Sequence, residues 1–415
     1  MPSLVSEYTS VDDALSRVTS KIRVRPTMER VSVENAFHRV SSGKVVAPHD
    51  APKAPTSHMD GFAVIHNDIQ GAGPSRPLAL KLVGSAGPGS RSKHKVGKGE
   101  AVQVATGAIL PPGADTVVPK EYAELSQGKV VVKLAADEGS YVYGAGDDFR
   151  KGDVVLAKGR WLRAQDVGLM VGLGFTTVDV WRQPRVTVIA TGSELTRSIR
   201  PEAGKIRESH SLVFMRLIES QGCVSVDGGV VGDDSKVLAR NLRKALTTSD
   251  LVITLGGTSA GAKDLIVDTV SNLRPDMLIH GIKLDRGRVT GVASVGGKPV
   301  LMLPGPIQAA MNAFLVLGVP LIQALSGCEM QGTEFVCRLG RDWEARKRFS
   351  DFKKVVYVKL RTGDETIADP LLGETESMGI LADADGYLLV PEGVTEMKAG
   401  ARVKIRLVAG FSGVL

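Results

Sequence analysis

Carboxylates and glycine-rich turns recur in the second half of this sequence where strand-forming runs end. The run Leu251-Val-Ile-Thr-Leu255 leads directly into Gly256-Gly-Thr-Ser-Ala-Gly261, and Ala262-Lys263-Asp264 follows before a helical pattern begins. Glycines let backbone N–H groups approach an anion, and the next helix presents its positive N-terminus to that anion. The pattern predicts an anion-binding loop, although a plain tight turn without a ligand is the competing interpretation.

Carboxylate and hydroxyl side chains recur in the polar loops of the chain. The carboxylates are Asp60, Asp148, Glu194, Asp233 and Asp264, and the hydroxyls include Thr106 and Ser259. Carboxylates beside an anion-binding loop are explained if a divalent cation lies between them and phosphate oxygens, which predicts a Mg²⁺-nucleotide or Mg²⁺-phosphate ligand. The competing interpretation is that each acid caps a helix or faces solvent. The sequence favours the cap for Asp234 and leaves both interpretations open for Asp264.

Alternating strands and helices from residue 185 onward would position these loops. Buried-strand runs occupy residues 186–190, 224–231, 251–255 and 299–303, with helical patterns between them and a long apolar helix over 307–325. This alternation predicts right-handed crossovers and a parallel sheet. Polar or glycine-rich loops follow the strands at 191–194, 233–234, 256–264 and 304–306. Open α/β sheets bind ligands at this edge, so the sequence predicts a site there.

The rest of the chain divides into smaller units. A proline-rich connector at 45–55 leads into short β runs separated by glycine and proline, and further β runs follow residue 330. We predict an α/β multidomain protein: a central doubly wound α/β domain, an inserted small β domain, an α+β linker domain and a C-terminal β domain. The predicted boundaries are 1–44 with 147–182 for the linker and dimerisation domain, 45–146 for the inserted domain, 183–328 for the α/β domain and 329–415 for the last.

Composition and charge limit the classes of partner. Lys and Arg number 52 against 45 Asp and Glu, a net charge of +7 that favours anionic ligands. Aromatic residues make up 5% of the chain and are not interleaved with basic clusters, so nucleic acid is not expected as a partner. The cysteines are widely spaced, and we find neither a leader nor a run of 18 apolar residues. These features predict a cytoplasmic protein without a membrane span.

An ordered set of motifs resembles the molybdopterin molybdotransferase family, which includes MoeA and the E domain of gephyrin. The motifs are Ser57-His-Met-Asp60-Gly-Phe-Ala, Thr106-Gly-Ala, Pro112-Gly-Ala-Asp115, Gly146-Asp-Asp148, Ala190-Thr-Gly-Ser-Glu194-Leu, Gly256-Gly-Thr-Ser-Ala-Gly261 and Leu303-Pro-Gly305. The resemblance implies a homodimer whose active site is shared between the subunits. It also implies Mg²⁺-dependent insertion of molybdate, or tungstate, into adenylylated molybdopterin with release of AMP. The adenylyltransferase that makes this substrate would be a candidate partner.

The resemblance implies roles for individual residues. Asp60 and Thr106 would reach the active site from the partner subunit and act in catalysis with Glu194 and Asp264. The metal ligands would be Asp233, Asp264 and Glu194. The residues that would bind the molybdopterin substrate are Gly256, Gly257, Ser259, Gly261, Lys283, Arg286, Pro304 and Gly305.

Several loops depart from the family pattern. Lys283-Leu-Asp-Arg286-Gly-Arg288 replaces a Lys-Pro-Gly-Lys-Pro loop, and Leu303-Pro-Gly-Pro306-Ile307 replaces Leu-Pro-Gly-Asn-Pro. Prolines that fix the loop are lost, and so is an amide able to donate and accept. In the last domain Gly373-Glu-Thr-Glu-Ser377 is more acidic than the expected Gly-Ser motif.

Two hypotheses of different class follow. The first is an active metal insertase, and the second is a catalytically impaired paralogue that carries or scaffolds molybdopterin or a nucleotide. They are separated by whether Lys283, Arg286 and Lys354 converge on one oxyanion pocket that faces Asp264. A generic α/β nucleotide-binding enzyme is a third hypothesis, which explains the loops but not the ordered motifs.

Overall fold

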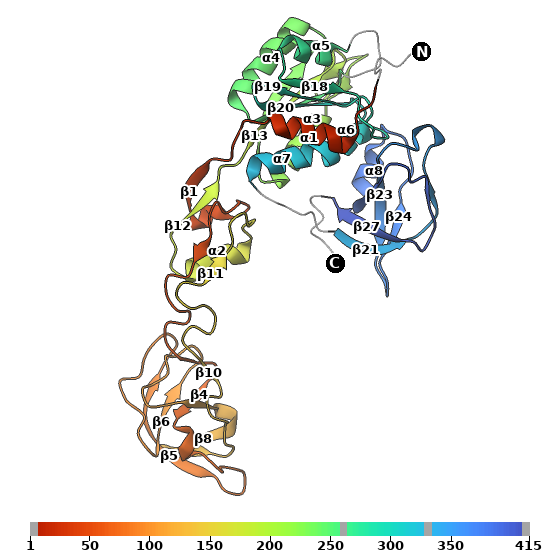
Figure 1. The fold of residues 1–415 in the computed structure, drawn as a ribbon. Coiled ribbons are helices and arrows are strands. Elements are labelled where there is room, and N and C mark those ends of the chain that lie inside the picture. The colour runs from red at the N-terminus through yellow and green to blue at the C-terminus, as the bar shows by residue number, and fades with distance from the viewer. Residues whose placement is uncertain (1–6, 258–263, 328–333, 409–415) are drawn as a thin grey trace.

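The computed structural model describes residues 7–257, 264–327 and 334–408. The molecule is elongated (Figure 1): the α/β domain lies beside the C-terminal barrel at one end, and the inserted β domain lies at the other. A small linker domain separates them. The structure confirms the predicted architecture of a central α/β domain, an inserted β domain, a linker domain and a C-terminal β domain.

A six-stranded sheet forms the centre of the α/β domain, in the order β16-β13-β17-β20-β19-β18. The strands are β16 (Val224–Val231), β13 (Arg185–Thr191), β17 (Leu251–Leu255), β20 (Lys298–Leu303), β19 (Gly291–Val295) and β18 (Met277–His280). The first four are parallel, whereas β19 and β18 pair antiparallel at one side. Parallel strands end at one edge, so the loops after β13, β17 and β20 meet there.

Helices cover both faces of this sheet. One face packs against α3 (His210–Ser220), α6 (Ile307–Ala313) and α7 (Val319–Ser326), and the other against α4 (Ser235–Thr248) and α5 (Leu265–Asn272). Alternate residues of one strand therefore point to opposite cores, as Ile253 and Val252 of β17 do. This double burial explains why the strands are continuous apolar runs.

The helix α1 (Val11–Lys21) shares the core of the α/β domain. Ser10 caps it by accepting a hydrogen bond from the backbone of Asp13. The buried face of α1 packs against β18, β19 and α7. The sequence grouped this helix with residues 147–182, but its apolar stripe is buried on the α/β sheet instead.

The linker domain is built from two short ladders and two helical segments. β1 (Met28–Ser32) pairs with β12 (Thr177–Trp181), and β2 (Val45–Val46) pairs with β11 (Val154–Leu156). The 3₁₀ turn η1 (Val33–Ala36) and α2 (Ala164–Gly172) complete its core. Asp166 of α2 is 3% exposed and accepts hydrogen bonds from Arg160 and Arg163.

The inserted β domain contains a six-stranded sheet in the order β7-β4-β6-β5-β9-β8. The strands are β7 (Thr116–Pro119), β4 (Gly61–Val64), β6 (Glu100–Val104), β5 (Leu78–Ala86), β9 (Lys129–Val132) and β8 (Ala123–Ser126). A ladder between β3 (Thr56–Ser57) and β10 (Val142–Tyr143) lies where the chain enters and leaves. Short turns at η2 (His66–Asp68) and η3 (Lys120–Tyr122) connect strands of the domain.

The C-terminal domain is a closed barrel in the order β21-β24-β23-β25-β27. Its strands are β21 (Glu334–Leu339), β24 (Ile367–Pro370), β23 (Lys354–Arg361), β25 (Gly386–Val390) and β27 (Arg402–Leu407). Outside the barrel lie the ladder of β22 (Trp343–Glu344) with β26 (Glu396–Met397), the turn η5 (Lys347–Phe349) and the helix α8 (Met378–Asp383). The barrel touches the α/β domain through α6, which contacts α8.

One continuous helical run, Ile307–Ser326, has the length and apolar composition of a membrane span among the described residues, with a mean hydropathy of 1.7. It comprises α6, the π-helical segment η4 (Phe314–Gly318) and α7. Within an 18-residue window of this run, 72% is buried inside the fold. Burial against the central sheet accounts for the apolar composition.

Candidate active site

A cavity of about 530 Å³ opens at the predicted edge of the α/β sheet. The loops that follow β13, β17 and β20 line it, through Thr191, Glu194, Gly256, Gly257, Pro304, Gly305 and Pro306. Additional walls come from the ladder of β14 (Leu195–Thr196) with β15 (Ile206–Arg207), and from Glu208, His210 and Arg288. The structure therefore brings together three of the four loops whose convergence the strand pattern predicted, whereas the loop at 233–234 does not line the cavity. His210 and Arg288 were not assigned to this edge from the sequence.

The glycines after β17 are required by the backbone. Gly256 and Gly257 have φ angles of 87° and 68°, in the left-handed region. A Cβ at Gly256 would lie 2.6 Å from the Thr191 carbonyl oxygen, and one at Gly257 would lie 2.7 Å from Ile266. These glycines let β17 and β13 end close together, which leaves room for the cavity. Ser259 and Gly261 lie outside the described residues.

Asp264 caps a helix and pairs with a histidine. Its Oδ1 accepts a hydrogen bond of 3.2 Å from the backbone N–H of Val267 at the start of α5. Its Oδ2 lies 3.2 Å from Nε2 of His280, and the two side chains are 11% and 18% exposed. Burial raises the pKa of the Asp264 carboxyl. The cap interpretation therefore applies, and Asp264 is not among the residues that line the 530 Å³ cavity.

The other two acids predicted as metal ligands are Asp233, which joins two loops, and Glu194. Asp233 Oδ2 accepts from the backbone N–H of Ser193, and the Ser193 hydroxyl accepts from the backbone N–H of Asp233. Glu194 lines the cavity. In the described part of the chain, no group of three His, Cys, Asp or Glu side chains is gathered for a metal ion. Within one subunit, the described residues therefore do not gather a set of protein ligands for Mg²⁺, and we derive no step through this ion.

Asp234 caps α4, as the sequence favoured. Its carboxylate accepts from the backbone N–H groups of Lys236 and Val237, at 2.8 and 3.1 Å. These bonds hold its pKa below the ordinary value. Asp234 therefore orients α4 without contributing to the cavity.

Asp60 and Thr106 form a compact unit in the inserted β domain. The backbone N–H and the hydroxyl of Thr106 donate to Asp60 Oδ1, at 2.8 and 2.9 Å. The hydrogen bond from the Thr106 backbone, followed by that from its hydroxyl, lowers the pKa of Asp60. Figure 1 shows that this domain lies at the opposite end of the subunit from the α/β sheet. The two residues come together with each other but not with the sheet edge of the same subunit.

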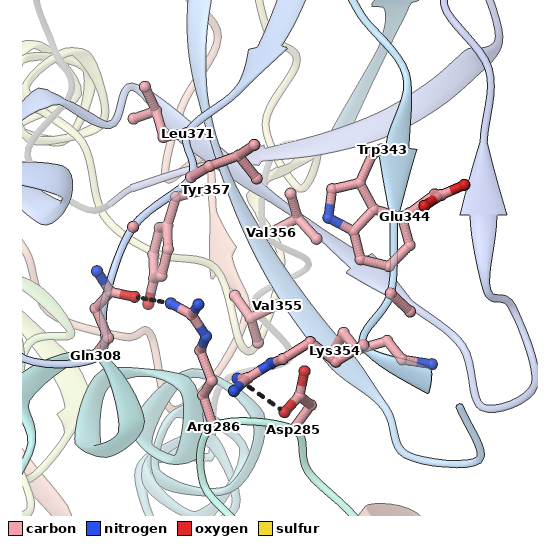
Figure 2. Close-up of a pocket in the computed structure, with 14 residues that line it drawn as sticks. Asp285, Arg286, Gln308, Trp343, Glu344, Lys354, Val355, Val356, Tyr357 and Leu371 are labelled. Carbon is pink, nitrogen blue, oxygen red and sulfur yellow. Dashed lines mark hydrogen bonds and ion pairs between the residues drawn. The ribbon is translucent and has the colours of Figure 1, made fainter. Parts of the chain in front are cut away.

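A second cavity of about 190 Å³ lies between the α/β domain and the barrel (Figure 2). Arg286 extends into it from the loop after β18, and its Nη1 donates to Oε1 of Gln308 at 3.0 Å. Lys354 and Arg346 line it from the barrel side, and Arg346 pairs with Asp285 at 3.2 Å. Three cationic side chains thus line a small space together with the carboxylates of Asp285 and Glu344.

Two expected members of this pocket are elsewhere. Lys283 pairs with Asp351 at 3.6 Å and lines neither of the two cavities. Asp264 does not line the small cavity either. Of the three cations expected to converge, Arg286 and Lys354 line this cavity, and Arg346 lines it as well. The Lys354 ammonium donates to the carbonyls of Ser350 and Val394 at 2.7 and 3.0 Å.

Two buried polar side chains that contact Arg286 could not be identified as site residues from the sequence pattern. Gln308 and Asn312 are 2% and 1% exposed on an otherwise apolar helical run. Asn312 Nδ2 donates to the Arg286 carbonyl at 3.0 Å, and the Tyr357 hydroxyl donates to Asn312 Oδ1 at 2.9 Å. The signal that could have revealed them is an amide on the buried face of an apolar helix, because such a group needs hydrogen-bonding partners.

Family comparisons agree with this arrangement of domains and loops. Residues 9–174 match the MoeA N-terminal region (domain I and II). Residues 187–324, which hold the central sheet and its glycine-rich edge, match a probable molybdopterin binding domain. The fold and the loop edge thus define a multidomain protein of the class that carries a molybdopterin-binding α/β domain.

Similarity extends over nearly the whole chain. Molybdopterin molybdenumtransferase of Bacillus subtilis is 30% identical over 413 residues, which cover 97% of this chain and 95% of that protein. The enzyme of the same name from Staphylococcus aureus strain COL is 29% identical, with coverage of 96% and 95%. A crystal structure of a molybdopterin biosynthesis MoeA protein from Pyrococcus horikoshii covers 98% of this chain and 100% of its own, with 30% identity and a TM-score of 0.78. The chain belongs to the molybdopterin molybdenumtransferase family, an enzyme family, which confirms the resemblance of its motifs.

Proposed function

We propose that this chain transfers molybdenum from molybdate, or tungsten from tungstate, into adenylylated molybdopterin with release of AMP. The observation that carries the proposal is that neighbouring residues of the same two segments line the two cavities. Arg286 lines the small cavity and Arg288 lines the large one. Likewise Gln308 lines the small cavity and Pro306 the large one. Two ligands bound there would lie on either side of the same short loops.

The sizes and linings of the cavities suit these two ligands. The small cavity, with Arg286, Arg346 and Lys354 around it, suits a tetrahedral oxyanion, because its charge needs nearby cations. The large cavity combines apolar side chains with glycines at strand ends, which suits a flat heterocycle joined to phosphates. The names of the relatives support molybdopterin as the substrate.

The chemistry requires charge neutralisation and close placement of the two ligands. Two metal–sulfur bonds form as oxo groups leave as water with protons drawn from solvent, and hydrolysis of the phosphoanhydride releases AMP. Arg286, Arg346 and Lys354 would offset the oxyanion charge as thiolates approach. The loop edge at Gly256 and Pro304 would hold the substrate against this pocket.

The remaining expectations are also part of this proposal. Asp60 and Thr106 are exposed on the inserted β domain, which lies far from the α/β sheet of the same subunit. This separation supports a homodimer in which the site is shared between subunits. We propose that Mg²⁺ arrives with the substrate phosphates, which supply oxygen ligands themselves. The adenylyltransferase that makes the substrate is the proposed partner, and the cytoplasm is the proposed location.

One observation favours the carrier or scaffold alternative. Asp285, and after it Glu374 and Glu376, oppose the effect of burial on the pKa of Arg286. Because Asp285 and Glu344 also line the small cavity, it is less positive than its three cations suggest. A weakly cationic pocket would hold the substrate without capturing an oxyanion.

AMP release from adenylylated molybdopterin tests the proposal. The native chain should release AMP only when molybdate or tungstate is present. Asp264→Ala should release little, because the capped start of α5 and the pairing with His280 are lost together. Tight binding of the adenylylate without oxyanion-dependent release would contradict the transferase and support the carrier.

A further inference from the structure

Gln308 joins three segments at the small cavity. Its Oε1 accepts from Arg286 Nη1 at 3.0 Å, and its Nε2 donates to the Ser377 carbonyl at 3.3 Å. Its backbone N–H donates to the Thr375 carbonyl at 3.0 Å. The side chain thus links the loop after β18 to the turn that precedes α8 in the barrel domain. Both polar atoms of its amide have partners, which fixes its orientation.

Gln308 is uncharged, so it leaves the positive charge of Arg286 available to a ligand. The guanidinium is half-buried; burial and the nearby Arg346 lower its pKa, yet an arginine keeps its proton in proteins. A neutral amide oxygen orients one N–H group and leaves the positive charge to attract a ligand. A carboxylate at the same position would pair with the guanidinium and cancel that charge.

Asn312 supports the same arginine from the other side. It holds the Arg286 carbonyl at 3.0 Å, and Tyr357 in turn holds Asn312. The backbone of Arg286 is therefore fixed by one amide and its side chain by another. Figure 2 shows the Gln308 amide and the guanidinium meeting at the edge of the cavity. Preorganised donors of this kind bind an anion without having to be ordered first.

We propose that Gln308 is a positioning residue that aims the Arg286 guanidinium into the small cavity and thereby sets the affinity for the oxyanion. The inference rests on the proposed function. It goes beyond it by assigning oxyanion affinity to a residue that touches neither the thiolates nor the adenylate. Loss of the amide frees the guanidinium to turn toward Glu374 and Glu376, which weakens capture of the oxyanion.

The test is equilibrium binding of molybdate and of tungstate to the full-length chain by calorimetry, followed by steady-state AMP release. The variants are Gln308→Leu, Gln308→Glu and Arg286→Ala, with Gln323→Leu as the matched control. Gln323 lies on the same helical run and lines neither of the two cavities. Gln308→Glu preserves the length of the side chain, so it remains informative if the leucine variant does not fold.

Gln308→Leu should weaken oxyanion binding about tenfold, and Gln308→Glu should weaken it further because its charge neutralises Arg286. KM for the oxyanion should rise while kcat and KM for the adenylylate stay near native. Gln323→Leu should match the native chain. Native affinity in both Gln308 variants, with binding lost in Arg286→Ala, would overturn this inference alone. A native chain that binds neither oxyanion would overturn the proposed function and this inference with it. If kcat and both KM values instead worsened by similar factors, Gln308 would only hold the two domains together, and this inference would be wrong.

Discussion

Arg286 and Arg288 lie two residues apart in one loop, yet they line different cavities. Arg286 donates to Gln308 at the small cavity, whereas Arg288 lines the large cavity and its guanidinium lies 5.2 Å from the ring centre of Phe349 in the C-terminal domain. One short segment therefore separates a small cationic pocket from a larger pocket with glycine-rich walls. Two ligands bound in these cavities would be separated by this segment.

The close approach of β13 and β17 predicts a specific sensitivity at Gly256. Gly256→Ala adds a Cβ 2.6 Å from the Thr191 carbonyl at a φ of 87°, so it should destabilise the chain by about 2–3 kcal/mol and abolish adenylylate binding. Gly296→Ala is the control, because Gly296 has a φ of 60° with open space around it. It should cost only about 1 kcal/mol and leave binding intact. Urea unfolding and calorimetry measure both effects, and equal losses in the two variants would contradict the argument.

The buried ion pair of the linker domain predicts a pH-dependent stability. Burial alone would raise the pKa of Asp166, but hydrogen bonds from Arg160 and Arg163 hold it well below its ordinary value of 3.8. A carboxylate with a lowered pKa stabilises the fold above its unfolded pKa, and this stability is lost as the pH falls through the folded pKa. Asp166→Asn should therefore lower the free energy of unfolding by about 1–2 kcal/mol at pH 7, a value discounted because both arginines are partly exposed.

Urea titrations of the native chain and Asp166→Asn at several pH values check this. The difference between them should be full above about pH 4 and should shrink below it. Asp179→Asn is a useful comparison, because Asp179 pairs with Arg30 on the surface of the same domain and should contribute much less. A gap between native and Asp166→Asn that stays constant into the acid range would contradict the prediction.

The distance between the inserted domain and its own sheet edge predicts complementation between inactive variants. If the site is shared, Asp60→Ala removes the partner subunit's side of it and Arg286→Ala removes a cation of the small cavity, and each should lower activity at least about tenfold at low oxyanion concentration. Subunits mixed by mild unfolding and refolding would form heterodimers with one intact site. Random mixing should restore about one quarter of native activity. No recovery in a mixture shown to contain heterodimers would place the whole site within one subunit.

The edge of the α/β sheet where the loops meet could be predicted because the residue patterns that form it are local in the sequence. A buried parallel strand is a continuous apolar run and its loop carries the polar residues, so 186–191, 251–257 and 299–306 were recognisable one at a time. Asp234 was recognisable as a cap for the same reason, since its partners lie within three residues. Parallel topology then forces the strand ends to meet.

The parts that escaped prediction depend on contacts distant in the sequence. Asp264 meets His280 only because β18 returns antiparallel beside β19. Gln308 and Arg346 reach the same pocket only because the barrel packs against α6. The apolar stripe of α1 shows that the helix is buried, but it does not name the sheet that buries it. Periodicity identifies a face and leaves its partner undefined.

The most direct test of the two-cavity account compares Arg286→Ala with Arg288→Ala in the AMP-release assay, varying oxyanion and adenylylated molybdopterin separately. Arg286→Ala should raise KM for molybdate about tenfold or more with little change in KM for the adenylylate, and Arg288→Ala should do the reverse. Two variants that alter the same KM to the same extent, or a native chain that releases no AMP with either oxyanion, would contradict the account.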